Sequence, residues 1–176
     1  MDIDFESYIR GSEPDKKEKA SAWKTAIGLQ AVDGLQTSDY LKDTAVKHIE
    51  GDISIDEVKK LINGYYQSKT ARTLQDEETE EADKVSANIA RILNEQSFAF
   101  SVAGFTSIHR RLFEEIFKFA GKIRDYDITK KEWVLRGDTV LYVNSEDLRR
   151  ALEYDLEQEK TFSYQGLSMD DVVVHI

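Results

Sequence analysis

Apolar residues recur three and four positions apart along most of this chain, and residues that begin or end helices stand around each run. The clearest run spans residues 38–50 and stops at Gly51. Ser54 and Glu57 then form the pattern of a capping box ahead of another amphipathic run. With only 1 proline and 9 glycines, the chain is predicted to be mainly α. The apolar face of the first run consists of Leu41, Ala45 and Ile49.

An earlier helix is predicted to begin at Ser12, whose hydroxyl can cap an acidic first turn that contains the proline. Residues 23–32 are apolar nearly all round, which predicts burial on several sides. The helix is expected to end at Asp33, with Gly34 as the residue after its cap.

Residues 75–83 are dominated by aspartate and glutamate. We interpret them as a solvated linker or an exposed first helical turn rather than a cation-binding segment. Helical spacing resumes from Ala82 to Gln96 and again from Ile108 to Ala120, where Gly121 is expected to stop the helix.

One β-hairpin is expected to interrupt the helices. Residues 132–135 and 139–143 have strand composition and flank Arg136-Gly137-Asp138, which we interpret as a hairpin connection and not as a cell-adhesion signal. Ser145 and Ser168 are predicted to cap two further helices. The second of these helices has no stop signal before Ile176, so we expect the sequence to be cut from a longer protein.

Composition excludes several classes of protein. The 24 Lys+Arg against 34 Asp+Glu give a net charge of −10, which argues against a nucleic-acid partner. The chain has no cysteine, so disulfide frameworks and thiolate metal sites are excluded. No basic-then-apolar leader and no long apolar run occurs, so we expect a cytoplasmic protein without a membrane partner.

The residues alone assign no active site. His48, His109 and His175 lack the spacing of metal ligands, and no phosphate-binding glycine loop is present. A Ser-His-Asp triad stays open as an alternative, although no nucleophile-elbow sequence supports one.

Two stretches nevertheless resemble a known family. The segments AIGLQAVDGLQTSDYL and HIEGDISIDEVKKLINGYY, within residues 23–66, resemble the VbhA-type antitoxin domain that inhibits Fic proteins. The segment IHRRLFEEIFKFAGKIRDY (108–126) looks like the first helix of a Fic domain, and KKEWVLRGDTVLYVNSEDL (130–148) is similar to the Fic flap. The resemblance implies an antitoxin-like helical domain over 12–68, a connecting acidic and helical segment over 69–96, and an incomplete Fic domain over 97–176.

The resemblance implies AMP transfer from ATP, with Mg²⁺, to a Ser, Thr or Tyr hydroxyl of a partner protein. Fic chemistry lies in a His-Pro-Phe-x-Asp/Glu-Gly-Asn-Gly-Arg motif, which positions the triphosphate and stabilises its charge. This sequence does not contain that motif, so no catalytic residue is assigned, and His175 is not followed by Pro-Phe. We expect the chain alone to be inactive.

The family's inhibitory motif is Ser/Thr-x-x-x-Glu-Gly/Asn, whose glutamate takes the place of the ATP γ-phosphate by pairing with an arginine of the Fic motif. In this sequence the matching positions are Leu29, Asp33 and Gly34, so the hydroxyl is replaced and the acid is shorter. A carboxylate at a helix C-terminus faces the negative end of the helix dipole, which is unfavourable. Asp33 is therefore an unusual residue at this position even without the family resemblance. The alternative is a solvated aspartate that merely precedes a capping glycine.

The flap-like residues Thr139, Val140, Leu141 and Tyr142 are expected to dock a target segment along an unpaired strand edge. The alternative is that Val140 and Tyr142 cover the helical core. For the whole chain, the alternative to a Fic-type enzyme is a non-catalytic helical regulatory or interaction module. The sequence assigns no oligomeric state.

Overall fold

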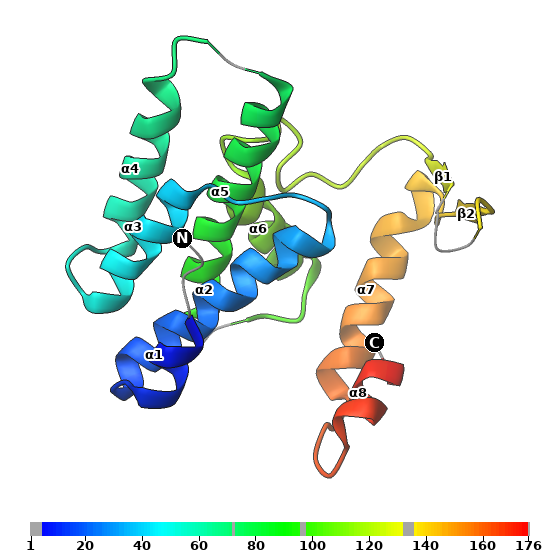
Figure 1. Cartoon of the computed structure of the whole chain (residues 1–176). Coiled ribbons are helices and arrows are strands. Elements are labelled where there is room, and N and C mark those ends of the chain that lie inside the picture. The colour runs from blue at the N-terminus through cyan, green and yellow to red at the C-terminus, as the bar shows by residue number, and fades with distance from the viewer. Residues whose placement is uncertain (1–4, 72, 96–97, 132–135, 176) are drawn as a thin grey trace. The chain divides into compact units, whose positions relative to one another are not determined.

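The computed structural model describes residues 5–71, 73–95, 98–131 and 136–175. Within these ranges the chain is mainly helical with one small two-stranded sheet, as predicted (Figure 1). It divides into two units, residues 1–97 with 108–120, and residues 98–107 with 121–176. The elements are α1 (Phe5–Gly11), α2 (Pro14–Val32), α3 (Asp39–Glu50), α4 (Ile55–Gln67), α5 (Leu74–Leu93), α6 (Val102–Phe113), β1 (Thr129–Lys131), β2 (Thr139–Leu141), α7 (Ser145–Thr161) and α8 (Met169–His175).

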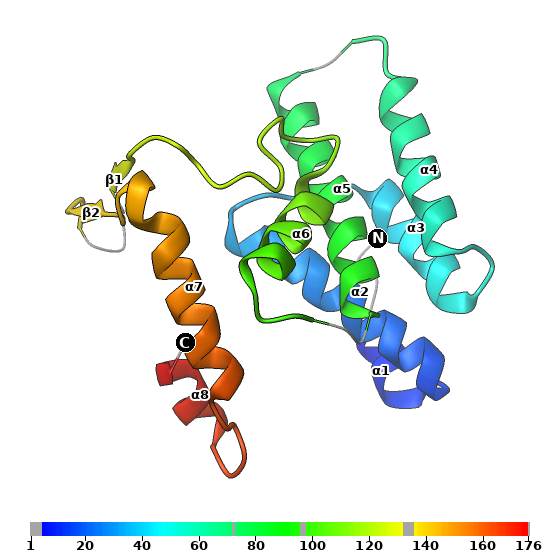
Figure 2. The same cartoon turned by 180° about the vertical axis from the view of Figure 1, so that it is seen from behind.

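The core of the first unit forms where α5 packs against α2 on one side and α4 on the other (Figures 1 and 2). Trp23 of α2 is fully buried there, and the short helix α1, which the sequence patterns did not predict, packs on α2. Small residues of α5 let the helices approach closely. The buried apolar residues of this cluster are Phe5, Ala20, Trp23, Ala26, Leu41, Ala45, Ile49, Val58, Ile62, Tyr66, Ala87 and Ala90.

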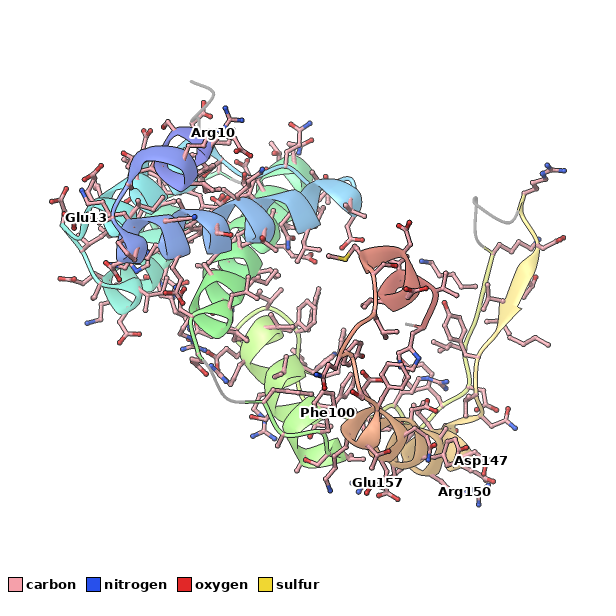
Figure 3. All side chains as sticks on the ribbon, turned by 90° about the horizontal axis from the view of Figure 1, so that it is seen from below. Arg10, Glu13, Phe100, Asp147, Arg150 and Glu157 are labelled. Carbon is pink, nitrogen blue, oxygen red and sulfur yellow. The ribbon has the colours of Figure 1, made fainter. Side chains whose placement is uncertain are left out.

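Helix α2 differs from its prediction at both ends. Its N-cap is Glu13, labelled in Figure 3, and not Ser12, because Pro14 already occupies the first helical turn. The prediction that α2 is buried on several sides is wrong for its last two turns, where Leu29 and Val32 are exposed. Alanines and Trp23 bury one face of α2 instead.

The end of α3 and the start of α4 confirm their predictions. The Ser38 hydroxyl accepts a hydrogen bond from the backbone N–H of Leu41, and Gly51 ends α3 with a φ of 86°. Ser54 and Glu57 form both hydrogen bonds of the predicted capping box.

The acidic residues 75–83 belong to α5 itself. Thr73 caps this helix in a second capping box with Asp76. The segment is therefore a helical start and not an extended linker, and its last residue, Asp83, is completely buried.

Helix α6 ends at Phe113, so the prediction that this helix continues to Ala120 and is stopped by Gly121 is wrong. Glu115 adopts a left-handed conformation with a φ of 67°, which stops the helix. Glu114, beside it, forms ion pairs with Lys59 of α4 and Arg91 of α5, at 2.9 and 3.3 Å. These interhelical contacts fix the chain where the apolar spacing alone would have continued the helix.

The second unit contains the hairpin and the last two helices. Strands β1 and β2 pair antiparallel, with Lys130 opposite Val140. The residues predicted as the first strand, 132–135, lie outside the described residues, and β2 ends at Leu141 and so excludes Tyr142. The N-cap of α7 is Asn144, and Ser145 is its first residue, contrary to prediction.

Helices α7 and α8 bury no residue of their own. Along α7, Asp147 and Arg150 form an exposed ion pair (Figure 3). Ser168 caps α8 as predicted, because its hydroxyl accepts from the Asp171 N–H while the Asp171 carboxylate accepts from Ser168.

Candidate functional site

The predicted regulatory residues lie at the end of α2. Asp33 is the C-cap residue, and Gly34 follows it with a φ of 78°. The Leu35 N–H donates to the Gln30 carbonyl at 3.0 Å, and the Gly34 N–H donates to the Ala31 carbonyl at 3.1 Å. These two bonds define a Schellman motif, which only a residue able to adopt a positive φ closes without strain. The local geometry at Gly34 is therefore as predicted.

Leu29 and Asp33 share one face of α2 because they stand four residues apart. Leu29 is 48% exposed, Asp33 is exposed, and Val32 beside them is 83% exposed. The last residue of α2 that is buried is Gln30. The end of the helix thus presents a carboxylate flanked by apolar side chains to its surroundings.

Negative charge gathers near Asp33. The pKa of Glu81 on α5 is raised, first by partial burial and then by the negative charges of Asp33 and Glu78. The end of α2 also carries the negative end of the helix dipole. This surface therefore favours a cationic group such as a guanidinium.

A polar cavity of about 400 Å³ is lined in part by Gly34, the residue after Asp33. Hydroxyl and amide side chains of the α2–α3 loop and of the first turns of α5 provide most of its wall. The lining residues are Gly34, Gln36, Thr37, Ser38, Gln75, Glu78 and Thr79.

The loop that follows Gly34 is attached to the core by Asp83. The carboxylate of Asp83 accepts from the Ser38 N–H at 2.8 Å, from the Ser38 hydroxyl at 2.5 Å and from the Tyr66 hydroxyl at 2.7 Å. Burial raises the pKa of Asp83, although these three donors oppose the rise. Burial, together with the hydrogen bond to Asp83, also raises the pKa of Tyr66, so its hydroxyl keeps its proton. We call Asp83, Ser38 and Tyr66 the Asp83 clamp.

The sequence patterns missed the Asp83 clamp because Asp83 closes an acidic run that was expected to be solvated. One signal could have found it. Asp83, Ala87 and Ala90 stand four and then three positions apart, so they share one face of α5, and all three are buried.

The predicted docking residues lie on and just after β2, in the second unit. Val140 is partly buried, whereas Thr139 and Leu141 are exposed and Tyr142 is 40% exposed. The Arg124 guanidinium donates to the carbonyls of Tyr126 and Val143, which ties the chain entering the hairpin to the chain leaving it. Among the described residues β2 pairs only with β1, so its other edge offers unpaired backbone groups.

The three histidines have structural partners, and the ring of His109 lies with its centroid 5.0 Å from that of Phe113. His48 Nδ1 accepts a hydrogen bond from the buried Trp23 Nε1 at 3.0 Å, and burial followed by the charge of Lys19 lowers the His48 pKa. His175 Nε2 lies 2.9 Å from Glu159 Oε2, and its ring stacks on Phe162. No group of three or more His, Asp or Glu side chains able to hold a metal ion occurs in the described part of the chain.

No family model, curated protein or solved structure matches the chain. Within the described ranges, no helix is both long enough and apolar enough to cross a membrane.

Proposed function

We propose that this chain is the regulatory and target-docking part of a Fic-type protein adenylyltransferase. The observation that carries the proposal is the end of α2. There the exposed carboxylate of Asp33 shares a face with Leu29, and a Schellman motif ends the helix. The sequence resemblance supplies the enzyme class, and the exposed position of Asp33 is compatible with it. The target is a protein that offers a Ser, Thr or Tyr hydroxyl.

In this proposal the Asp33 carboxylate binds the arginine that would otherwise hold the γ-phosphate of ATP. A carboxylate and a phosphate offer a guanidinium the same paired acceptor geometry, so one can replace the other. The negative surroundings formed by Glu78 and Glu81 favour the arginine further. Nucleotide then binds without the contacts that orient its α-phosphate, and AMP transfer is suppressed.

In this proposal the chain itself supplies the inhibitory carboxylate of Asp33 and the hairpin that docks the target. The base, the phosphate cradle and the arginine belong to the Fic motif, which this sequence does not contain. Residues outside the sequence must supply them, in the same polypeptide or in a separate one. The exposed edge of β2 is the surface that holds the target segment as an added strand.

The test begins with the codons after Ile176 and with the proteins that bind this chain, one of which must carry the Fic motif. The protein that combines both parts is assayed for transfer of labelled AMP, as are its Asp33→Ala and Asp33→Glu variants. A hydrogen bond to a charged group is worth about 1.5–3 kcal/mol, so Asp33→Ala should raise nucleotide affinity by one to two orders of magnitude. Asp33→Glu should lower both affinity and transfer, because it restores the length of the family's acid.

Asp52→Ala is the matched control, since Asp52 is also an exposed carboxylate just beyond a helix end, here that of α3. It should change neither affinity nor transfer. The 176-residue chain by itself should transfer no label. Equal activity of the wild type and both Asp33 variants would contradict the inhibitory role, and absence of the Fic motif from every candidate protein would favour the non-catalytic interaction module.

A further inference from the structure

The connection between α2 and α3 is short and has few attachments. No residue between Gln30 and Leu41 is fully buried, although Tyr40, at the start of α3, packs against the core and stacks on Tyr65 with ring centroids 4.3 Å apart. Ahead of α3, the loop makes hydrogen bonds at two points. One is the Leu35 N–H on the Gln30 carbonyl, and the other is Ser38 on Asp83. Only Gln36 and Thr37 lie between these points.

Ser38 is fixed in orientation as well as in position. Its N–H and its hydroxyl donate to different oxygens of the same carboxylate, Oδ1 and Oδ2 of Asp83. The same hydroxyl accepts from the Leu41 N–H and so begins α3. One residue thus couples the loop, the start of α3 and the interior of α5.

Helix α4 also holds the carboxylate of Asp83. The Tyr66 hydroxyl, on a side chain that is 2% exposed, donates to Asp83 Oδ2. Asp83 is itself fully buried, so its charge depends on these donors for stabilisation. The attachment point of the loop is therefore as rigid as the packing of α4 against α5.

We infer that Asp83 is a positioning residue that, through Ser38, fixes the α2–α3 loop and with it the place and direction of the Asp33 carboxylate. Ser38 stands five positions after Asp33, and an extended chain over that distance reaches at most about 17 Å. The Schellman motif shortens this reach, since it folds the first two residues of the loop back onto α2. Releasing Ser38 removes the hydrogen bonds that join this loop to α5.

The positioning part of this inference concerns the first unit alone, and its link to inhibition rests on the proposed function. Amide hydrogen exchange on the 176-residue chain tests the first part. In Ser38→Ala the exchange of the Gly34 and Leu35 amides should accelerate about tenfold, because the hydroxyl bond to Asp83 is lost and only the bond from the residue 38 N–H must break on local opening. Ser38→Thr keeps the hydroxyl and should restore slow exchange.

Ser54→Ala is the matched control, because it removes a helix N-cap of the same kind from α4 without touching Asp83. It should accelerate the amides at the start of α4 and leave Gly34 and Leu35 unchanged. Equal acceleration at Leu35 in both variants, or none in Ser38→Ala, overturns the inference. Tyr66→Phe gives a second variant with Ser38 intact, and it should accelerate Leu35 less than Ser38→Ala does.

The second part is measured in the protein that carries the Fic motif. Ser38→Ala should raise AMP transfer toward the level of Asp33→Ala and should add nothing in the Asp33→Ala background. Activation by Asp33→Ala without activation by Ser38→Ala overturns the positioning role and leaves the proposed function standing. No activation by either variant, together with faster Leu35 exchange in Ser38→Ala, refutes the proposed function and leaves the loop attachment standing.

Discussion

Replacing Gly34 with alanine isolates the backbone conformation that ends α2. Gly34 has a φ of 78°, and a Cβ added there would meet no atom within 4 Å. The substitution therefore adds no clash, and its cost is that of holding an L-residue in the left-handed region. That cost is about 1–2 kcal/mol of unfolding free energy.

Gly28→Ala makes the same chemical change six residues earlier and should have the opposite sign. Gly28 lies inside α2 with an ordinary helical backbone, and its added Cβ also meets nothing within 4 Å. Alanine in a helix interior is more stable than glycine by roughly 0.5–1 kcal/mol. The two variants should thus differ by about 2 kcal/mol although each adds a single methyl group.

Urea unfolding followed by tryptophan fluorescence measures both variants. The chain has 2 tryptophans, so a Trp133→Phe background makes the signal report on Trp23, which is buried in the first unit. With a urea dependence of about 1–3 kcal/mol per molar, the two midpoints should lie roughly 1 M apart, on either side of the parent. Midpoints that shift in the same direction, or a Gly34→Ala midpoint equal to the parent, would refute the reasoning from φ.

Two other measurements follow from the structure. Burial alone would raise the pKa of Glu114, but the positive charges of Lys59 and Arg91 lower this pKa overall. The ionised Glu114 therefore stabilises the folded state at any pH above its unfolded-state pKa. This stability is lost as the pH falls through the lower folded-state pKa. Urea midpoints measured from pH 6 down to pH 3 should therefore fall more steeply in the parent than in Glu114→Gln, and parallel curves would contradict the ion-pair assignment. In the proposed protein that carries the Fic motif, Val140→Pro removes a backbone donor from β2 and should reduce transfer of AMP to a protein target roughly tenfold more than Val140→Ala. Equal losses in the two variants, or losses that only follow a lower melting temperature, would make the hairpin structural.

The features that the sequence predicted well depend on residues close together in the chain. The capping box of Ser54 with Glu57 and the glycine stops at Gly34 and Gly51 each involve residues at most a few positions apart. Their hydrogen bonds form within the helix end itself, so the local pattern suffices.

The features that it missed depend on distant partners. Asp83 is buried because Ser38 and Tyr66, 45 and 17 residues away, supply donors that local composition does not reveal. Helix α6 stops at Phe113, where Glu114 pairs with Lys59 and Arg91 in other helices. At the candidate site, the place of Asp33 was predictable, whereas the exposure of Leu29 and Val32 depends on which face of α2 the other helices cover.

The Asp83 clamp also has a kinetic consequence. The hydrogen bonds between Ser38 and Asp83 close a loop of 45 residues, and the entropy lost on closing a loop grows with its length. Helices α3 and α4 can form from local contacts before that closure takes place. We therefore expect the clamp to be absent from the folding transition state, so that weakening it accelerates unfolding and leaves the folding rate nearly unchanged. The end of α2 would then be the last part of the first unit to reach its native position and the first part to leave it.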